Sequence, residues 1–188
     1  MIVNCFERND KKALLLQFNN CVQPSFSNAL RRSLLLDVPS LAVEKVNVFK
    51  NTTTFPCETI AQRLTLVPLN KHVHEGDKFE IEADGPCHLY SDAITINACK
   101  GGFAKGVLVA RLAKGQQLKM TGSFKKSTGS EHARFQKTAA VSSFKEKGKQ
   151  ASLSFESNDD RSAAEHLLIA VDALIEKIEK LSVVASTS

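Results

Sequence analysis

A glycine-rich segment and a pair of neighbouring histidines come closest to residue patterns that support chemistry. Segment 101–106, Gly-Gly-Phe-Ala-Lys-Gly, lacks the Gly-Lys-Ser/Thr ending of a phosphate-binding loop and the G-x-G-x-x-G spacing of a dinucleotide fold, so a plain turn is expected. His72 and His74 supply half of a metal site, but no carboxylate or thiol stands at a usual companion spacing. The sequence therefore predicts no bound cofactor and no metal ion.

Three further residues have the type of a nucleophile or a base. Cys57 follows Pro56 at an expected helix start, where the helix dipole favours a thiolate, whereas the usual burial of free cysteine favours a plain core residue. Glu131 and His132 are adjacent in sequence, but no nucleophile motif accompanies them. Because no catalytic constellation can be assembled, we expect no catalytic residue in this chain.

The cysteine content and the composition indicate a globular chain from a reducing compartment. The 188 residues include five cysteines, an odd number without a C-x-x-C pair, which argues against a disulfide framework or a zinc ribbon. Hydrophobic residues make up 43% and charged residues 24%, which excludes a disordered chain. No apolar run approaches a membrane span, and no signal peptide is visible. We expect an intracellular protein, in the nucleus or the cytoplasm, with no membrane partner.

Positive charge is concentrated in one segment. Residues 100–150 carry 12 Lys and Arg against 2 Asp and Glu, and the Lys125-Lys126 pair lies among phenylalanines. Basic residues interleaved with aromatic ones are typical of nucleic-acid binding, but also of strands with a solvated face or of a docking surface for an acidic protein. The phenylalanines are Phe124, Phe135 and Phe144. One alternative for the whole chain is therefore a stand-alone nucleic-acid-binding module that uses the basic segment 100–150.

The C-terminal segment gives the strongest structural signal. Ser162 and Glu165 form a capping box, in which the serine accepts from the third helical amide and the glutamate reaches back. Apolar residues then recur at alternating steps of three and four, as in a coiled-coil seam. The seam consists of Ala164, Leu167, Val171, Leu174, Ile178 and Leu181. Such a helix packs either on its own domain or lengthwise against a long helix of a partner.

A shorter helix is expected over residues 25–37, with Ser25 as its N-cap and Pro39 just beyond its end. One of its faces is apolar and consists of Phe26, Ala29, Leu30 and Leu34. The chain has no second long helix to cover the C-terminal seam. Two helices with uncovered apolar faces indicate dimerisation.

Most of the remaining elements are predicted strands. A hairpin is expected from strands at 2–7 and 13–18, followed further on by a strand at 41–49 in which Glu44-Lys45 marks a bulge. A helix begins at Pro56, and short apolar stretches separated by turn residues then indicate a β-rich unit. Strict alternation from residue 151 predicts a half-buried strand. The expected fold class is α+β.

Several motifs are similar to those of one protein family. Residues 28–42, Asn-Ala-Leu-Arg-Arg-Ser-Leu-Leu-Leu-Asp-Val-Pro-Ser-Leu-Ala, resemble the N-A-L-R-R…V-P-x-x-A signature of the α-like subunits of multisubunit RNA polymerases. That family includes the bacterial α subunit, its archaeal counterpart and the eukaryotic third-largest subunit. Residues 51–53 and 61–69 resemble the N-T-S…I-A-H-R-L-G-L-I-P-L stretch of the archaeal and eukaryotic versions. Residues 129–135 are similar to their G-K-x-H-A-K-W segment.

The resemblance implies a discontinuous α/β dimerisation domain from residues 1–69 and 150–188, with residues 70–149 as an inserted β-rich domain. It also implies a non-catalytic assembly subunit of a DNA-directed RNA polymerase. Such a subunit forms a heterodimer with a smaller α-like subunit, and the pair is the platform for the largest and second-largest, catalytic subunits. Small accessory polymerase subunits are further partners, and DNA is met only indirectly through the complex.

The resemblance and the helical patterns together assign two sets of site residues. The partner-binding dimer seam consists of Phe26, Leu30, Leu34, Leu167, Val171, Leu174, Ile178 and Leu181. The contact with the second-largest subunit is assigned to Arg31 and Arg32 in the first motif.

The chain also departs from the family pattern. Its insert has only Cys87 and Cys99, without the clustered cysteines that carry zinc or an iron–sulfur cluster in some relatives. Gln62 stands where the family has a histidine, and Phe135 where it has a tryptophan. We expect no counterpart of the helical DNA-binding domain that follows in the bacterial α subunit. A reduced version of the archaeal or eukaryotic type suits a large DNA virus, which would place the chain in a virion or a viral factory.

Overall fold

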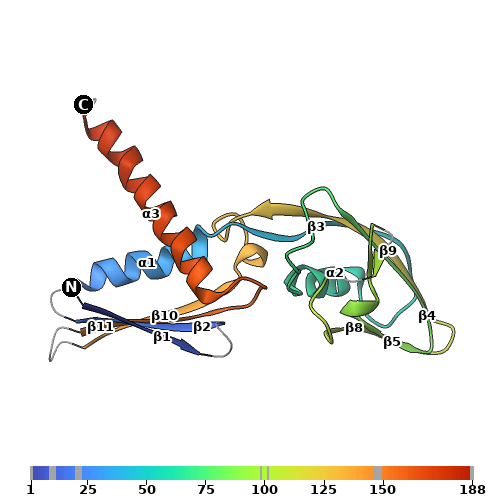
Figure 1. The fold of residues 1–188 in the computed structure, drawn as a ribbon. Helices are drawn as coiled ribbons and strands as arrows, with labels where there is room; N and C mark the ends of the chain where they lie inside the picture. Colours follow the sequence, from blue (N-terminus) through green and yellow to red (C-terminus); the bar gives the residue numbers. More distant parts are fainter. Residues whose placement is uncertain are drawn as a thin grey trace. The chain divides into compact units, whose positions relative to one another are not determined.

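The computed structural model describes residues 2–8, 12–19, 23–97, 99–100, 102–145 and 150–186. The chain divides into two compact units. Residues 1–39 and 128–188 form a discontinuous unit, called here the sheet–helix unit, and residues 40–127 form a continuous unit, called the insert unit. The mixture of helices and antiparallel sheets confirms the α+β class (Figure 1).

The sheet–helix unit contains a four-stranded antiparallel sheet in the order β1-β2-β11-β10. The predicted hairpin is confirmed, because Val3 pairs with Phe18 and Glu7 with Leu14. The alternation in the predicted C-terminal strand is confirmed as well, since Leu153 and Phe155 are buried. The strands are β1 (Ile2–Arg8), β2 (Ala13–Asn19), β10 (Thr138–Lys145) and β11 (Gln150–Ser157).

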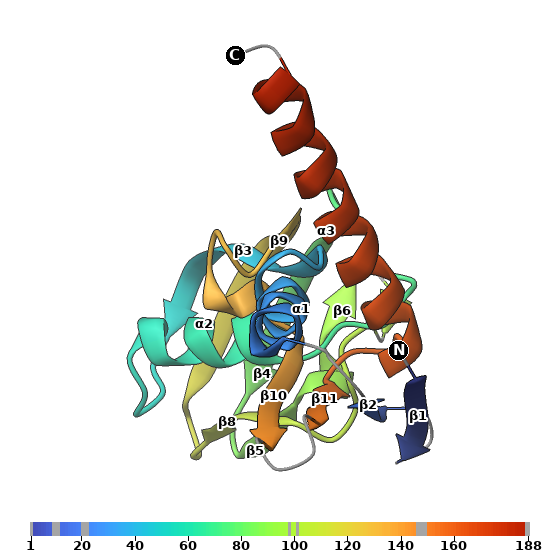
Figure 2. The same ribbon diagram turned by 90° about the vertical axis from the view of Figure 1, so that its left-hand side faces the viewer.

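Two helices, α1 (Pro24–Leu36) and α3 (Ala163–Ser186), cover one face of this sheet (Figures 1 and 2). The predicted capping box of α3 is confirmed: Ser162 N donates to Glu165 Oε2 at 2.7 Å, and Glu165 N donates to Ser162 Oγ at 3.2 Å. The predicted N-cap of α1 was wrong, because Gln23 occupies that position. Pro24 is the reason, since proline suits the first helical position, where no amide proton is needed.

A short 3₁₀ turn, η2 (Ala133–Phe135), precedes β10. The core between the sheet and the two helices is apolar. Leu30 and Leu34 of α1 and Ala163 and Ala170 of α3 are buried in it. The sheet contributes Leu14, Leu16, Phe18, Ala151, Leu153 and Phe155.

The insert unit is built on a five-stranded sheet, β3-β9-β4-β6-β7, and a two-stranded ribbon, β5-β8. Three aromatic rings, of Phe79, Phe103 and Phe124, meet in its core with centroids 5.6–5.9 Å apart. The predicted bulge is confirmed by a register shift between Val43 and Lys45. The elements are β3 (Ser40–Asn51), α2 (Cys57–Leu66), β4 (Lys78–Asp84), β5 (Cys87–Tyr90), η1 (Ser91–Ala93), β6 (Thr95–Ile96), β7 (Cys99–Lys100), β8 (Leu108–Leu112) and β9 (Gln117–Ser127).

The boundaries of the two units differ from the expected ones. We expected residues 70–149 as the insert, whereas the inserted unit spans 40–127. Strand pairing explains the difference, because β3 pairs with β9 over almost its whole length and β10 pairs with β11. A strand belongs to the unit that supplies its hydrogen-bonding neighbours.

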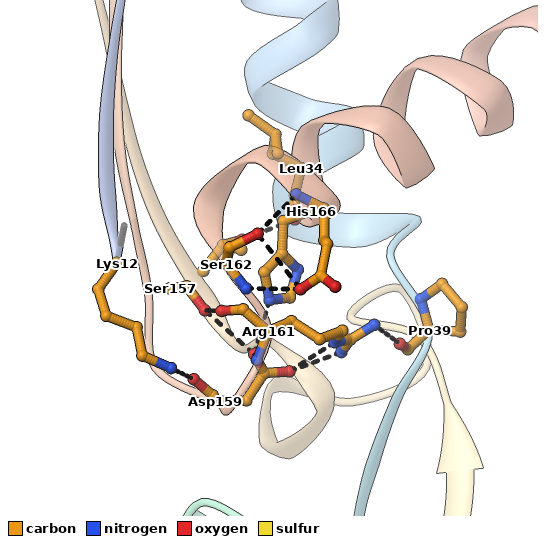
Figure 3. Close-up of polar contacts among 10 residues, drawn as sticks. Lys12, Leu34, Pro39, Ser157, Asp159, Arg161, Ser162 and His166 are labelled. Carbon is orange, nitrogen blue, oxygen red and sulfur yellow. Dashed lines mark hydrogen bonds and ion pairs between the residues drawn. The ribbon is translucent and has the colours of Figure 1, made fainter. Parts of the chain in front are cut away.

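A largely buried carboxylate holds the start of α3 (Figure 3). Asp159 lies in the turn between β11 and α3. Its Oδ1 accepts from Ser157 Oγ at 3.0 Å, from Arg161 N at 3.0 Å and from His166 Nε2 at 2.8 Å. Its Oδ2 accepts from the Arg161 guanidinium at 2.8 and 2.7 Å. Because a carboxylate only accepts, Nε2 of the fully buried His166 must carry the donated proton.

The same cluster reaches two more segments of the unit. Arg161 Nη1 donates to the Pro39 carbonyl at 2.9 Å, and Lys12 Nζ donates to the Asp159 carbonyl (Figure 3). The turn before β2, the end of the first chain segment and the start of α3 therefore meet at residues 159–161.

The surroundings of Asp159 make its ionised form part of the fold. Burial raises the pKa of this carboxyl, but the hydrogen bond and charge of His166 and those of Arg161 outweigh it. The pKa therefore lies well below its ordinary value of 3.8. A carboxyl with a lower pKa in the folded state stabilises the fold above its unfolded pKa, and this contribution is lost as the pH falls through the folded pKa.

We expect Asp159→Asn to lower the free energy of unfolding by about 3 kcal/mol at neutral pH, because Arg161 loses its charged partner in a largely buried site. The wild-type chain should also lose stability as the pH falls below about 4, and the variant should change less in that range. Urea unfolding followed by circular dichroism at several pH values measures both effects.

Glu156→Gln is the matched control, because Glu156 is an exposed carboxylate on β11. It should change the free energy of unfolding by no more than about 0.5 kcal/mol. Acid sensitivity that stays the same in Asp159→Asn as in the wild type would show that another group controls it.

Candidate protein-docking surface

The outer half of α3 lies outside the core of its own unit. From Ile175 to Ala185 every side chain is exposed, and in both views this half extends beyond α1 and the sheet of the sheet–helix unit (Figures 1 and 2). Seven large apolar side chains of α3 are exposed: Leu168, Val171, Ile175, Ile178, Leu181, Val183 and Val184. The first half is different, since Leu167 and Leu174 are half-buried against the core.

The structure divides the predicted seam into an inner and an outer part. Val171, Ile178 and Leu181 are 36%, 64% and 69% exposed, so they belong to the open surface. Leu30 and Leu34 are only 3% and 1% exposed, because α1 lies directly on the sheet and these side chains are part of its core. Their assignment to a partner seam is therefore corrected.

Phe26 is the exception on α1. It lies in the first turn of the helix and is 47% exposed. Its ring stands edge-on to Phe18 of β2, with the centroids 6.0 Å apart. About half of this side chain therefore stays exposed beside the core.

A cleft of about 240 Å³ opens where α1 and α3 diverge. Its walls are mixed, with aliphatic side chains beside an ion pair between Lys177 Nζ and Asp37 Oδ1 at 2.6 Å. The residues that line it are Ala29, Arg32, Ser33, Leu36, Asp37, Leu174 and Lys177. Ser33 Oγ donates to the Ala170 carbonyl at 2.8 Å and fixes the helices at the base.

The two neighbouring arginines of α1 differ in their surroundings. The Arg31 guanidinium donates to Asn28 Oδ1 at 2.8 and 3.2 Å and is thereby held along its own helix. Arg32 is exposed, lines the cleft and has no hydrogen bond or ion pair with any residue that the structure describes. Adjacent helical residues lie about 100° apart around the axis, which separates the two side chains.

The residues considered for chemistry do not form a site. Within the described ranges, no group of three or more His, Cys, Asp or Glu side chains is placed to hold a metal ion. His74 donates its backbone amide to Asp77 Oδ2 at 2.8 Å, and Cys57 is half-buried beside Asn51. Among the described helices, none is long and apolar enough to cross a bilayer.

Sequence reasoning missed the cleft and the Asp37–Lys177 pair. A separation of 140 residues gives no local signal for such a pair. The motif that contains both arginines did mark the segment, but it could not tell which of them faces the cleft. The position of Asp37 directly after α1 weakly predicts a nearby cation, because a helix C-terminus favours a positive charge such as that of Lys177.

Comparison with known proteins gives relatives of one kind. The DNA-directed RNA polymerase subunit Rpo3 of Methanocaldococcus jannaschii is 33% identical over 120 residues, which cover 62% of this chain and 62% of the relative. The Rpo3 subunit of Pyrococcus furiosus is 33% identical over 61% of this chain and 49% of its own length. The Rpo3 subunit of Natronomonas pharaonis is 30% identical over 74% of this chain and 58% of its own length. The chain thus spans about half to three fifths of the length of these curated relatives.

No family model matches the chain. The archaeal relatives nevertheless match most of it and are RNA polymerase subunits, as the motif in α1 predicted. The comparisons therefore support the assignment of the chain to the α-like subunits of DNA-directed RNA polymerase.

Proposed function

We propose that this chain is a non-catalytic assembly subunit of a DNA-directed RNA polymerase. It pairs with a smaller α-like subunit, and the pair is the platform on which the two large catalytic subunits and the small accessory subunits assemble. The chain works inside a cell, in its nucleus or cytoplasm, or in a viral factory. The single observation that carries the proposal is the exposed apolar outer half of α3.

The outer half of α3 is physically incomplete as it stands. Isolated helices shorter than about 12–15 residues are marginal in water, and the large apolar side chains of this half are all exposed. Exposed apolar side chains gathered on one helix mark a protein interaction surface more often than a solvated one. Steps of three and four suit a second helix that runs lengthwise along the first. A partner helix on this surface supplies the missing burial.

The cleft suggests how the pair can recruit a large subunit. Arg32 presents a cation without a described counterion, and the guanidinium binds a carboxylate or a carbonyl through two parallel hydrogen bonds. The aliphatic wall from Leu36 and Leu174 lowers the local dielectric, so such a pair is worth more than one in open water. We assign Arg32, in preference to Arg31, to the contact with the second-largest subunit.

We expect Ile178→Asp to abolish co-purification with the smaller α-like subunit, because it buries an unpaired carboxylate at a cost of several kcal/mol. Ile178 tests the interface better than Leu174, because Leu174 also packs on the core of its own unit and its substitution would affect folding as well. Co-expression with an affinity tag on one partner, followed by size-exclusion chromatography, measures the pairing.

Val141→Asp is the matched control, because Val141 is 69% exposed on β10 of the same unit, close to the 64% of Ile178. It should pair normally. Normal pairing of Ile178→Asp at wild-type expression would contradict the assignment of α3 to the interface.

We expect Arg32→Ala to leave the α-like pair intact and to weaken recruitment of the second-largest subunit by about tenfold or more, the usual range for a charge-assisted bidentate contact. Arg31→Ala is the control and should behave as the wild type, since its guanidinium is held by Asn28. Stepwise reconstitution from purified subunits separates the two stages. Equal effects of both variants would show that the cleft is not the contact.

A further inference from the structure

In the basic stretch 105–127 of the insert unit, the Lys and Arg residues fall into two groups, and one of them is largely neutralised within the chain. On β9, Lys119 pairs with Glu82 at 3.0 Å and Lys125 with Glu44 at 3.8 Å. Phe124 of this strand is 3% exposed, so its ring is closed to any ligand. The basic and aromatic pattern around Lys125 therefore serves the fold of the unit itself.

The second group lies on the β5–β8 ribbon. Arg111 of β8 stands directly opposite His88 of β5, and both residues are exposed. Tyr90 is 40% exposed, whereas Leu89 between it and His88 is buried. Because alternate strand residues point to one side, His88 and Tyr90 share the open face of the ribbon, about 7 Å apart. Exposed lysines at positions 105 and 114 flank the two ends of β8.

These cations have no counterion in the described part of the chain. The side chains of Arg111, Lys105 and Lys114 make no hydrogen bond or ion pair there. The two neighbouring carboxylates form no ion pair with these three cations in the described part of the chain; Asp84 accepts from Gln117 Nε2 at 2.7 Å and Asp92 from Gly106 N at 3.4 Å. Residues 100–127 contain seven Lys and Arg and no Asp or Glu. A cationic surface of this kind attracts an anionic partner.

We propose that the open face of the β5–β8 ribbon binds single-stranded nucleic acid. Arg111 and the two flanking lysines contact phosphates, and the Tyr90 ring stacks on a base. Nucleic acid suits this face better than an acidic protein, because the centre of a protein interface is apolar and depleted of charge, whereas this face is polar and cationic at its centre. The residues of this site belong to the insert unit and are not those of the assembly surface on α3, and the proposal does not rest on the assembly role.

The test uses the full-length chain and a fluorescein-labelled 20-nucleotide oligothymidylate, with binding followed by fluorescence anisotropy at several salt concentrations. With three phosphate contacts, the logarithm of the association constant should fall with the logarithm of salt concentration with a slope of about −2. The double variant Arg111→Gln, Lys114→Gln should bind more weakly, with a slope of about −0.7. Tyr90→Leu should weaken binding by about tenfold, and Tyr90→Phe should bind as the wild type.

The double variant Lys125→Gln, Lys126→Gln is the matched control, because it removes the same charge from β9. It should change the affinity by less than about twofold, and thermal melts check that every variant is folded. Equal losses in both double variants, or no binding by the wild type, would overturn the proposal. Unchanged affinity together with lost co-purification of a polymerase subunit would identify an acidic protein as the partner of the ribbon instead.

Discussion

The contact between Asp159 and its donors fixes the direction of α3, and the proposed assembly surface depends on that direction. His166 and Arg161 meet the carboxylate within the first turn of the helix and just before it. The exposed half of α3 begins about two turns later, and at about 1.5 Å per residue its described part reaches roughly 18 Å further. Further along the helix, Ser33 and Asp37 hold α3 through the Ala170 carbonyl and Lys177. A largely buried ionic cluster suits this role because it tolerates few alternative geometries.

Local signals were enough to predict the elements around this cluster. The capping box, the N-terminal hairpin, the bulge in β3 and the alternation in β11 are each encoded by residues within a few positions of one another. The family also followed from sequence, because the motif in α1 combines two arginines with a helix end and a proline at fixed spacing. The N-cap of α1 was misjudged because Ser25 competes with Pro24, and proline already fits the first helical position.

The site itself depends on long-range packing that periodicity does not encode. Leu30 and Leu34 have the same spacing whether a sheet of the same chain or a partner covers them. Only the three-dimensional structure shows that the sheet of their own unit covers them. The difference between Arg31 and Arg32 likewise depends on where α3 leaves α1. The unit boundaries were missed for the same reason, because β3 finds its partner β9 about 75 residues further along the chain.

The pairing of β3 with β9 has a consequence for how this chain can change over evolution. Ser40 and Ser127, the first and last residues of the insert unit, are direct strand partners. Their Cα atoms are therefore only about 5 Å apart. Enlargement, reduction or exchange of everything between them leaves the two chain ends at the same spacing, so the sheet beneath α1 and α3 does not have to adjust. Because the insert unit begins and ends at paired strand residues, related proteins can gain or lose the whole unit while the sheet–helix unit is retained.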